Sequence, residues 1–175
     1  DGAVWMPMLS ADTIGLLNAT TGDTLYSYEL PHCRDANHVQ LIEQDATAMV
    51  SCRATNSFLK VDVASKRTTW ALGGRWGNFT LYDLDGRAYA PGTSLWHGQH
   101  NAEWFGEQPG NASAGATVSE VLMFDNAYDE GKSSRMLIVE VDEAKLEARE
   151  AWEFKTGAYT PVYGDNDRLP TGNLL

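Results

Sequence analysis

The chain has 175 residues, of which 43% are hydrophobic and 21% charged, and this composition excludes a disordered polymer. Its net charge of -11 disfavours nucleic acid and anionic membranes as partners, because the 13 basic residues are spread along the sequence and only Lys66 and Arg67 are adjacent. No apolar run reaches the roughly 20 residues that a membrane-spanning helix needs, so no membrane insertion is expected.

Short apolar runs bounded by Gly, Asn, Asp and Pro follow one another along the chain, and this pattern is typical of many short antiparallel strands. In chain order, we expect strands over residues 24–30, 39–42, 48–52, 58–63, 68–72, 118–124, 136–141 and 151–154. Residues 142–152 fit a helix and a turn followed by a strand equally well. The expected fold class is all-β.

A weak internal repeat sharpens this expectation. Three segments share an apolar strand, an Asn or Asp turn and a second strand that an aromatic residue opens, with turns at Asn18, Asp62 and Asp142. The first two turns are 44 residues apart and the last two are 80 apart, which leaves room for one degenerate unit near residue 102. A period of about 40 to 45 residues is that of a four-stranded propeller blade, although a β-sandwich with coincidental hairpins is an alternative.

We therefore expect residues 1–175 to form a single domain, a partial β-propeller with about four blades. A closed propeller usually has more blades than this, and both ends of the sequence lie in apolar, strand-like stretches. The domain is thus expected to be incomplete at its C-terminal end and also at its N-terminal end. Its expected partner is then the remaining part of its own propeller, present as a separate chain, or a structural assembly.

Cysteines and glycosylation sequons point to the secretory pathway. A disulfide between Cys33 and Cys52 would close a loop of about 20 residues and add roughly 3 kcal/mol of stability in an oxidising compartment. Two unpaired buried thiols are the alternative. Sequons at Asn18, Asn78 and Asn111 lie in turn-like sequence and predict glycosylation, although a chance sequon is expected in any chain of this composition. We expect a secreted or extracellular glycoprotein.

Polar residues that the strand pattern does not need are concentrated in four places, at residues 32–38, at 51–53, at 96–104 and at 124–126 with 133–135. Turns from successive blades of a propeller converge at one end of its axis, so these residues could form one pocket. Imidazole and guanidinium donors match the oxygens of sulfate or phosphate, which favours a small anion as the ligand.

Metal binding is the competing interpretation of the same residues. His97, His100 and Glu103 could supply ligands, but residues three apart on a strand face opposite sides, so an anion is favoured. The acidic loops 125–130 and 165–167 could hold calcium, yet neither has the full EF-hand ligand pattern. We expect no metal and no cofactor.

At these same residues the chain resembles the arylsulfotransferase family, including its eukaryotic branch. The resemblance runs from Asp35 to the end, about four-fifths of the chain, and rests on the order and spacing of several short segments. These segments are Asp35-Ala-Asn-His38, Ser51-Cys-Arg53, Phe58-Leu-Lys-Val-Asp62, Trp70-Ala-Leu-Gly-Gly74, Gln99-His100, Phe124-Asp-Asn126, Ser134-Arg135, Val139-Glu-Val-Asp142, Trp152-Glu-Phe and Arg168-Leu-Pro-Thr-Gly-Asn173.

The resemblance implies a six-bladed propeller in which a central channel hosts sulfuryl transfer from a phenolic sulfate ester to a phenol. In the characterised members a histidine carries the sulfuryl group between the two substrates. The matching positions give His38 and His100 as sulfuryl-binding or acid/base residues, with Arg53 as a third catalytic residue that contacts the anion. Four neighbours are expected to bind substrate, a small aryl sulfate or other small anion: Asn37, Gln99, Asn101 and Arg135.

Two departures limit what the resemblance carries over. The nucleophilic histidine of the bacterial enzymes matches a later blade, beyond Leu175, and the arginine that follows their Phe-Asp-Asn segment has no counterpart in residues 127–132. Arg135 is the nearest replacement, although it also aligns with a different, structural arginine. A catalytically inactive secreted propeller that serves as a binding or structural assembly module is therefore the alternative function.

Overall fold

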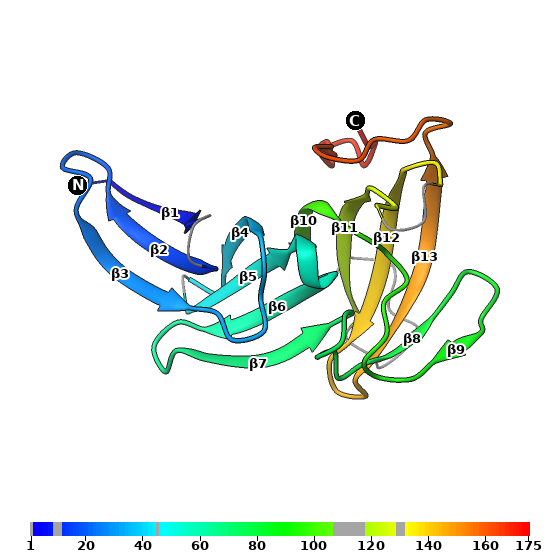
Figure 1. Ribbon diagram of the computed structural model, residues 1–175, viewed down its shortest axis with the longest axis horizontal. Helices are drawn as coiled ribbons and strands as arrows, with labels where there is room; N and C mark the ends of the chain where they lie inside the picture. Colours follow the sequence, from blue (N-terminus) through cyan, green and yellow to red (C-terminus); the bar gives the residue numbers. More distant parts are fainter. Residues whose placement is uncertain (1, 9–11, 45, 107–117, 129–131) are drawn as a thin grey trace.

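The computed structural model describes residues 2–8, 12–44, 46–106, 118–128 and 132–175 (Figure 1). Within these ranges the chain forms β-strands and one 3-10 helix, η1 (Arg53–Thr55), with no α-helix. The all-β prediction is confirmed, and residues 142–152 are a turn that leads into a strand. None of the described segments is a helix of the length and apolarity that crossing a bilayer requires.

The first two sheets are antiparallel and follow the chain order of their strands. The first has three strands in the order β1–β2–β3, with bounds Ala3–Met8, Thr13–Asn18 and Thr24–Glu29. The second has four strands in the order β4–β5–β6–β7, with bounds Ala36–Ile42, Thr47–Cys52, Ser57–Asp62 and Arg67–Leu72. The second sheet is thus a four-stranded meander of the kind expected for a propeller blade.

The third sheet is a similar meander with an added hairpin. Its four main strands are β10 (His100–Phe105), β11 (Ser119–Asp125), β12 (Arg135–Asp142) and β13 (Glu147–Lys155). The hairpin precedes them in sequence and consists of β8 (Thr80–Tyr82) and β9 (Ala88–Tyr89). It extends the outer edge of the sheet, where β8 pairs in parallel with β13.

The repeated hairpin that the sequence predicts is present once in each sheet, as β2–β3, β6–β7 and β12–β13. In every copy the side chain of the Asn or Asp accepts the backbone N–H three residues later, with N···O distances of 3.1 Å at Asn18, 2.7 Å at Asp62 and 3.0 Å at Asp142. In every copy the residue after this N–H donor has a positive φ. The pairing of the two strands also shifts register immediately after the position opposite the aromatic residue. The three hairpins are therefore equivalent parts of one repeat.

The number of sheets differs from the expectation. The described residues form three sheets rather than about four, and no fourth unit is centred near residue 102, where β10 begins the third sheet. The turns at Asp62 and Asp142 are 80 residues apart because two insertions lengthen one repeat. These insertions are the β8–β9 hairpin and the stretch of sequence between β10 and β11. The number of blades in the closed propeller stays a prediction.

The hydrophobic core lies between the faces of neighbouring sheets. One cluster joins the first sheet to the second and includes Ile14, Val50 and Leu59, and a larger one joins the second to the third through Phe58, Trp70 and other apolar residues. Strand β4 lies beside both β1 and β10, at the upper edge of the arc in Figure 1. We refer to β1, β4 and β10 as the inner strands. The segment that follows β13 lies at this same edge.

Candidate functional site

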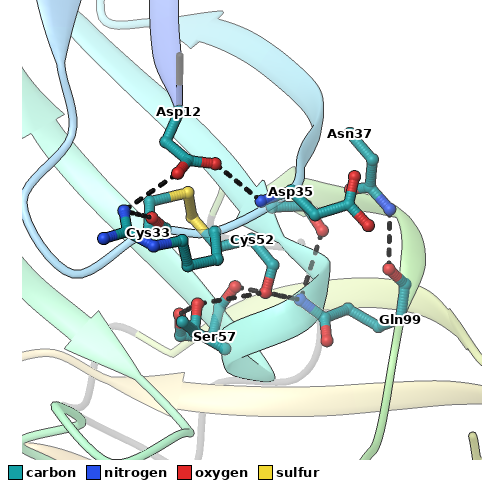
Figure 2. Close-up of a disulfide and its surroundings, with 10 residues drawn as sticks. Asp12, Cys33, Asp35, Asn37, Cys52, Ser57 and Gln99 are labelled. Atoms are coloured by element: carbon teal, nitrogen blue, oxygen red, sulfur yellow. Dashed lines mark hydrogen bonds and ion pairs between the residues drawn. A yellow bond between two sulfur atoms is a disulfide. The ribbon is translucent and has the colours of Figure 1, made fainter. Parts of the chain in front are cut away.

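A disulfide anchors the first polar segment. Cys33 and Cys52 are bonded, as predicted, and both are fully buried (Figure 2). The bond fastens the turn before β4 to the end of β5. Next to it, the backbone N–H of Arg53 donates to the carbonyl of Asp35 over 2.9 Å, so the two segments are held side by side.

Arg53 follows β5 directly and is held by three groups. Its Nη1 donates to the Asp35 carboxylate over 3.0 Å, its Nη2 donates to the carbonyl of Pro161 over 3.0 Å, and its guanidinium lies 5.0 Å from the ring centre of Tyr128. The Nε of Arg53 is buried and has no hydrogen-bond partner in the described part of the chain. Arg53 therefore keeps one donor that a ligand could use.

Strands β4 and β10 are joined immediately before their histidines. Nδ2 of Asn37 donates to the carbonyl of Gln99 over 2.8 Å, and the next residues along the two strands are His38 and His100. The Gln99 side chain is fully buried, and its Nε2 lies 2.9 Å from the carbonyl of Ser57 and 3.2 Å from that of Cys52 (Figure 2). The predicted residues Asn37 and Gln99 therefore connect the second sheet to the third.

The orientation of Asn126 decides which nitrogen of His100 carries a proton. Nδ2 of Asn126 donates to the carbonyls of Thr160 and Tyr163 over 2.7 Å and 2.6 Å, so its Oδ1 must be the atom that lies 2.7 Å from Nδ1 of His100. An amide oxygen only accepts hydrogen bonds, so Nδ1 of His100 is the donor. In the neutral ring, Nε2 is then unprotonated and free to act as a base or nucleophile.

His38 lies in a different environment on the neighbouring strand. Its Nε2 is buried and has no hydrogen-bond partner among the described residues. Burial lowers the pKa of His38 below its usual value, and the negative charge of Asp165 opposes this shift. The environment therefore favours the neutral imidazole at His38.

Residues 158–168, which we call the strap, cover this region. Besides its bonds to Arg53 and Asn126, the strap accepts a hydrogen bond of 2.9 Å at the carbonyl of Asn166 from Nδ2 of Asn101. Ser134 adds a fourth attachment, because its Oγ accepts the N–H of Thr160 over 2.9 Å. The strap was not predicted from the sequence, since it has neither strand nor helix periodicity.

Buried polar atoms without partners are concentrated in the same place. In the part of the chain that the structure describes, six of eight such side-chain atoms belong to Asn37, His38, Arg53, Gln99 and Asn166. Buried polar groups in folded proteins are nearly always hydrogen-bonded to protein or to ordered water, so this concentration calls for a partner, water or ligand, beyond the described residues. We call the seven residues around it the inner-strand site: Asn37, His38, Arg53, Gln99, His100, Asn101 and Asn126.

The remaining predicted residues lie elsewhere. Unlike the other predicted substrate-binding residues, Arg135 is not part of the inner-strand site. Its guanidinium instead contacts Asp125, Glu150, Glu153 and the carbonyl of Leu95. Asn126 was noticed only as part of a motif, and its contact with His100 could not be read from the sequence. Of the sequons, Asn78 is exposed and Asn18 is half-buried, whereas Asn111 lies outside the described residues.

Among the described residues, neither metal alternative gathers a set of ligands. The described residues contain no group of three or more His, Cys, Asp or Glu side chains placed to hold an ion. Residues 129 and 130 of the acidic loop 125–130 lie outside the described ranges. The side chain of Asp125 is directed to Arg135 at 2.9 Å, which gives this carboxylate a structural partner.

Comparison with known proteins agrees with the sequence motifs. The family model described as Arylsulfotransferase (ASST) matches residues 35–175, well over half of the chain. The chain belongs to the arylsulfotransferase family. No curated protein matches the chain in sequence. The arylsulfotransferase segments identified from the sequence, from Asp35 onward, coincide with the matched region.

Comparison with solved structures finds similar folds for this arylsulfotransferase-family chain. An auxiliary nutrient binding protein from Bacteroides thetaiotaomicron is similar over 85% of this chain and 33% of its own, with 13% identity and a TM-score of 0.50. The WD40 domain of Toxoplasma gondii coronin is similar over 93% of this chain and 35% of its own, with 10% identity and a TM-score of 0.43. The chain thus spans about a third of the length of these structures.

Proposed function

We propose that this protein is an arylsulfotransferase-like transferase that moves a sulfuryl group from a phenolic sulfate ester to a phenol at the inner-strand site. The family supports the reaction class. The observation that carries the proposal is the 2.7 Å hydrogen bond between Nδ1 of His100 and Oδ1 of Asn126, which leaves Nε2 of the neutral ring with a free lone pair. Such a nitrogen is what proton transfer to and from phenols requires.

The reaction needs a proton to be moved twice. When the donor ester loses its sulfuryl group, the S–O bond breaks and the departing phenolate must be protonated. When the acceptor takes up the sulfuryl group, its hydroxyl proton must be removed. We assign both transfers to Nε2 of His100: the protonated ring gives its proton to the departing phenolate, and the neutral ring left behind then takes the hydroxyl proton of the acceptor, which restores the protonated ring for the next cycle. The group that carries the sulfuryl moiety between the half-reactions is not assigned to a residue of this chain.

The other members of the site have binding roles in this proposal. Arg53 offers its free Nε–H to an ester oxygen, and guanidinium donors suit such oxygens. His38, with an unpaired Nε2, can bind the sulfuryl group or share the acid/base work. The unpaired Oδ1 of Asn37 is an acceptor, so it suits the hydroxyl of a phenol better than a sulfate oxygen.

The decisive experiment follows release of p-nitrophenol from p-nitrophenyl sulfate by the purified full-length protein, with phenol as the acceptor. We expect activity that depends on phenol, and a loss of at least about 100-fold in His100→Ala, since a general acid/base typically contributes that much. The matched control is His32→Ala, because His32 is exposed and its ring stacks on Trp76 at 4.0 Å. Absence of phenol-dependent release, or equal rates in His100→Ala and wild type, would contradict the proposal.

A binding role is the alternative outcome of the same experiment. If p-nitrophenyl sulfate binds in calorimetry but is not consumed, the unpaired polar atoms of the site serve recognition alone. That result would favour a secreted propeller that acts as a binding or structural assembly module. Loss of this binding in Arg53→Ala, with retention in His32→Ala, would place the ligand at the inner-strand site.

We also propose that the protein is secreted and glycosylated. The Cys33–Cys52 disulfide is consistent with an oxidising compartment. The amide of Asn78 is exposed, and its Oδ1 is fixed by the N–H of Ala71 over 2.9 Å, so its Nδ2 is available for attachment. Mass spectrometry of peptides from native material before and after enzymatic deglycosylation tests this. Unmodified Asn18, Asn78 and Asn111 would contradict it.

A further inference from the structure

Three carboxylates surround the guanidinium of Arg135 and form what we call its cage. One of them, Asp125, is the chain neighbour of Asn126 in the inner-strand site. The Nε of Arg135 donates to Asp125 over 2.9 Å, its Nη1 to Glu153 over 2.9 Å and its Nη2 to Glu150 over 2.7 Å. The side chain of Arg135 is only 15% exposed, and those of Asp125 and Glu150 are 4% and 5% exposed. Burial by itself lowers the pKa of Arg135, but Glu150 and the other two carboxylates raise it above its ordinary value. The guanidinium therefore stays charged.

The cage holds both segments that flank His100 and its partner. Nη2 of Arg135 also donates to the carbonyl of Leu95 over 2.7 Å, in the loop that leads into β10. The other oxygen of Asp125 accepts the backbone N–H groups of His97 and Ala127, each over 2.9 Å. One guanidinium thus ties the loop before His100 to the turn after β11.

Asn126 lies in the chain between Asp125 and Ala127, one of the two residues whose backbone N–H the Asp125 carboxylate accepts. Asp125 and Ala127 are its chain neighbours, and both are fixed through the Asp125 side chain. Asn126 in turn fixes the protonated nitrogen of His100. A continuous series of contacts therefore runs from Glu150 and Glu153 on β13 to the imidazole ring.

We propose that Arg135 is a positioning residue that, through Asp125 and Asn126, holds His100 in the Nδ1–H tautomer. Its importance for catalysis rests on the proposed function, but its effect on the tautomer does not. The predicted contact of Arg135 with substrate is not needed here, because four directions of its guanidinium are already used within the protein. Groups that orient a functional histidine in this way commonly account for about 10- to 100-fold in function.

A lysine cannot replace this arrangement. The planar guanidinium donates along several fixed directions at once, whereas an ammonium is a point charge with three donors on a flexible stem. Arg135→Lys keeps the positive charge among the three carboxylates, so the buried acids stay compensated. It loses the simultaneous hold on the carbonyl of Leu95 and on Asp125, and the position of Asn126 is then less strictly defined.

The test compares Arg135→Lys with Arg149→Lys, an exposed residue of β13 whose guanidinium lies 5.3 Å from the ring centre of Tyr82. Nitrogen-15 NMR of the imidazole of His100, in protein without substrate, reports the tautomer. We expect only the Nδ1–H form in wild type and in Arg149→Lys, and a mixture of both tautomers in Arg135→Lys. In the p-nitrophenyl sulfate assay, kcat of Arg135→Lys should fall about 10- to 100-fold with little change in KM.

A pure Nδ1–H form in Arg135→Lys would overturn the inference. If Arg135→Lys does not fold, Asp125→Asn serves instead, because its amide oxygen can still accept the two backbone N–H groups while the ion pair to Arg135 is lost. A mixed tautomer in that variant supports the inference, and an unchanged one overturns it. If wild type lacks transferase activity, the proposed function fails, while the NMR result still decides the role of Arg135.

Discussion

Asn37 donates a 2.8 Å hydrogen bond to the carbonyl of Gln99, and this bond joins two sheets one residue before a histidine in each. Gln99 reciprocates, since its own amide reaches back to the carbonyls of Cys52 and Ser57 in the second sheet. The two amides thus set the alignment of β4 against β10. They place His38 and His100 at matching positions on neighbouring inner strands.

The buried amide of Gln99 should be important for stability. In Gln99→Leu the size of the side chain is nearly kept, but the carbonyls of Cys52 and Ser57 lose the hydrogen bond from its amide. This happens where the side chain has no exposed surface. We expect the free energy of unfolding to fall by about 2 to 4 kcal/mol, since each unsatisfied buried group costs about 1 to 3 kcal/mol. Urea unfolding followed by fluorescence measures this. Asn173→Ala, at an exposed asparagine, is the control, and an equal midpoint for both variants would refute the prediction.

Removing the disulfide should destabilise the protein without changing its fold. Cys33 and Cys52 are 19 residues apart in sequence, and a loop of this size is worth about 3 kcal/mol. We expect the double variant Cys33→Ala/Cys52→Ala to lose roughly this amount in urea unfolding. Both cysteines are fully buried, so a reductant should act on the wild type only when it is partly unfolded. Rapid reduction in the absence of urea would contradict this.

The stability of the protein should depend on His38 in mildly acidic solution. Its pKa in the folded protein is below the ordinary value of 6.5, so below that value the unfolded chain binds more protons than the folded one. Stability is therefore retained above pH 6.5 and is lost as the pH falls from there through the lower, folded-state pKa. In His38→Gln this contribution is absent.

The measurement compares the free energies of unfolding of wild type and His38→Gln at about pH 7.5 and about pH 5.5. Wild type should lose more stability between these two values than the variant does. The carboxyl groups of Glu103 and Glu150, whose pKa values burial raises, change stability in the opposite direction as the pH falls. They are common to both proteins, so the difference isolates His38. Parallel pH profiles would show that His38 makes no such contribution.

Arg53 should control how firmly the strap is held. Arg53→Lys keeps a positive charge near Asp35, but an ammonium cannot also reach the carbonyl of Pro161 in the geometry of the guanidinium fork. We expect limited proteolysis to cut within residues 158–168 several-fold faster in this variant, while global stability falls by only about 1 kcal/mol. The exposed Arg149→Lys variant is the control. An unchanged cleavage rate would mean that the other strap contacts suffice.

Features fixed by neighbours in sequence could be predicted from the sequence. The hairpin turns at Asn18, Asp62 and Asp142 are made by hydrogen bonds that span three residues, so their composition shows directly in the chain. The strands around them follow from short apolar runs. Membership of the arylsulfotransferase family was likewise recognised from the order of short motifs.

Features made by contacts between distant segments required the tertiary structure. Asn37 and Gln99 are 62 residues apart, and the orientation of Asn126 is set by carbonyls 34 and 37 residues further along. The spacing of the turns suggested an additional unit near residue 102. The β8–β9 hairpin accounts for part of that spacing, because β8 pairs with β13, which comes much later in the chain. Sequence patterns record the preferences of each segment, whereas packing of the sheets decides which segments meet. The tautomer of His100 and the cage around Arg135 belong to that second class, because every bond that defines them crosses from one turn or strand to another.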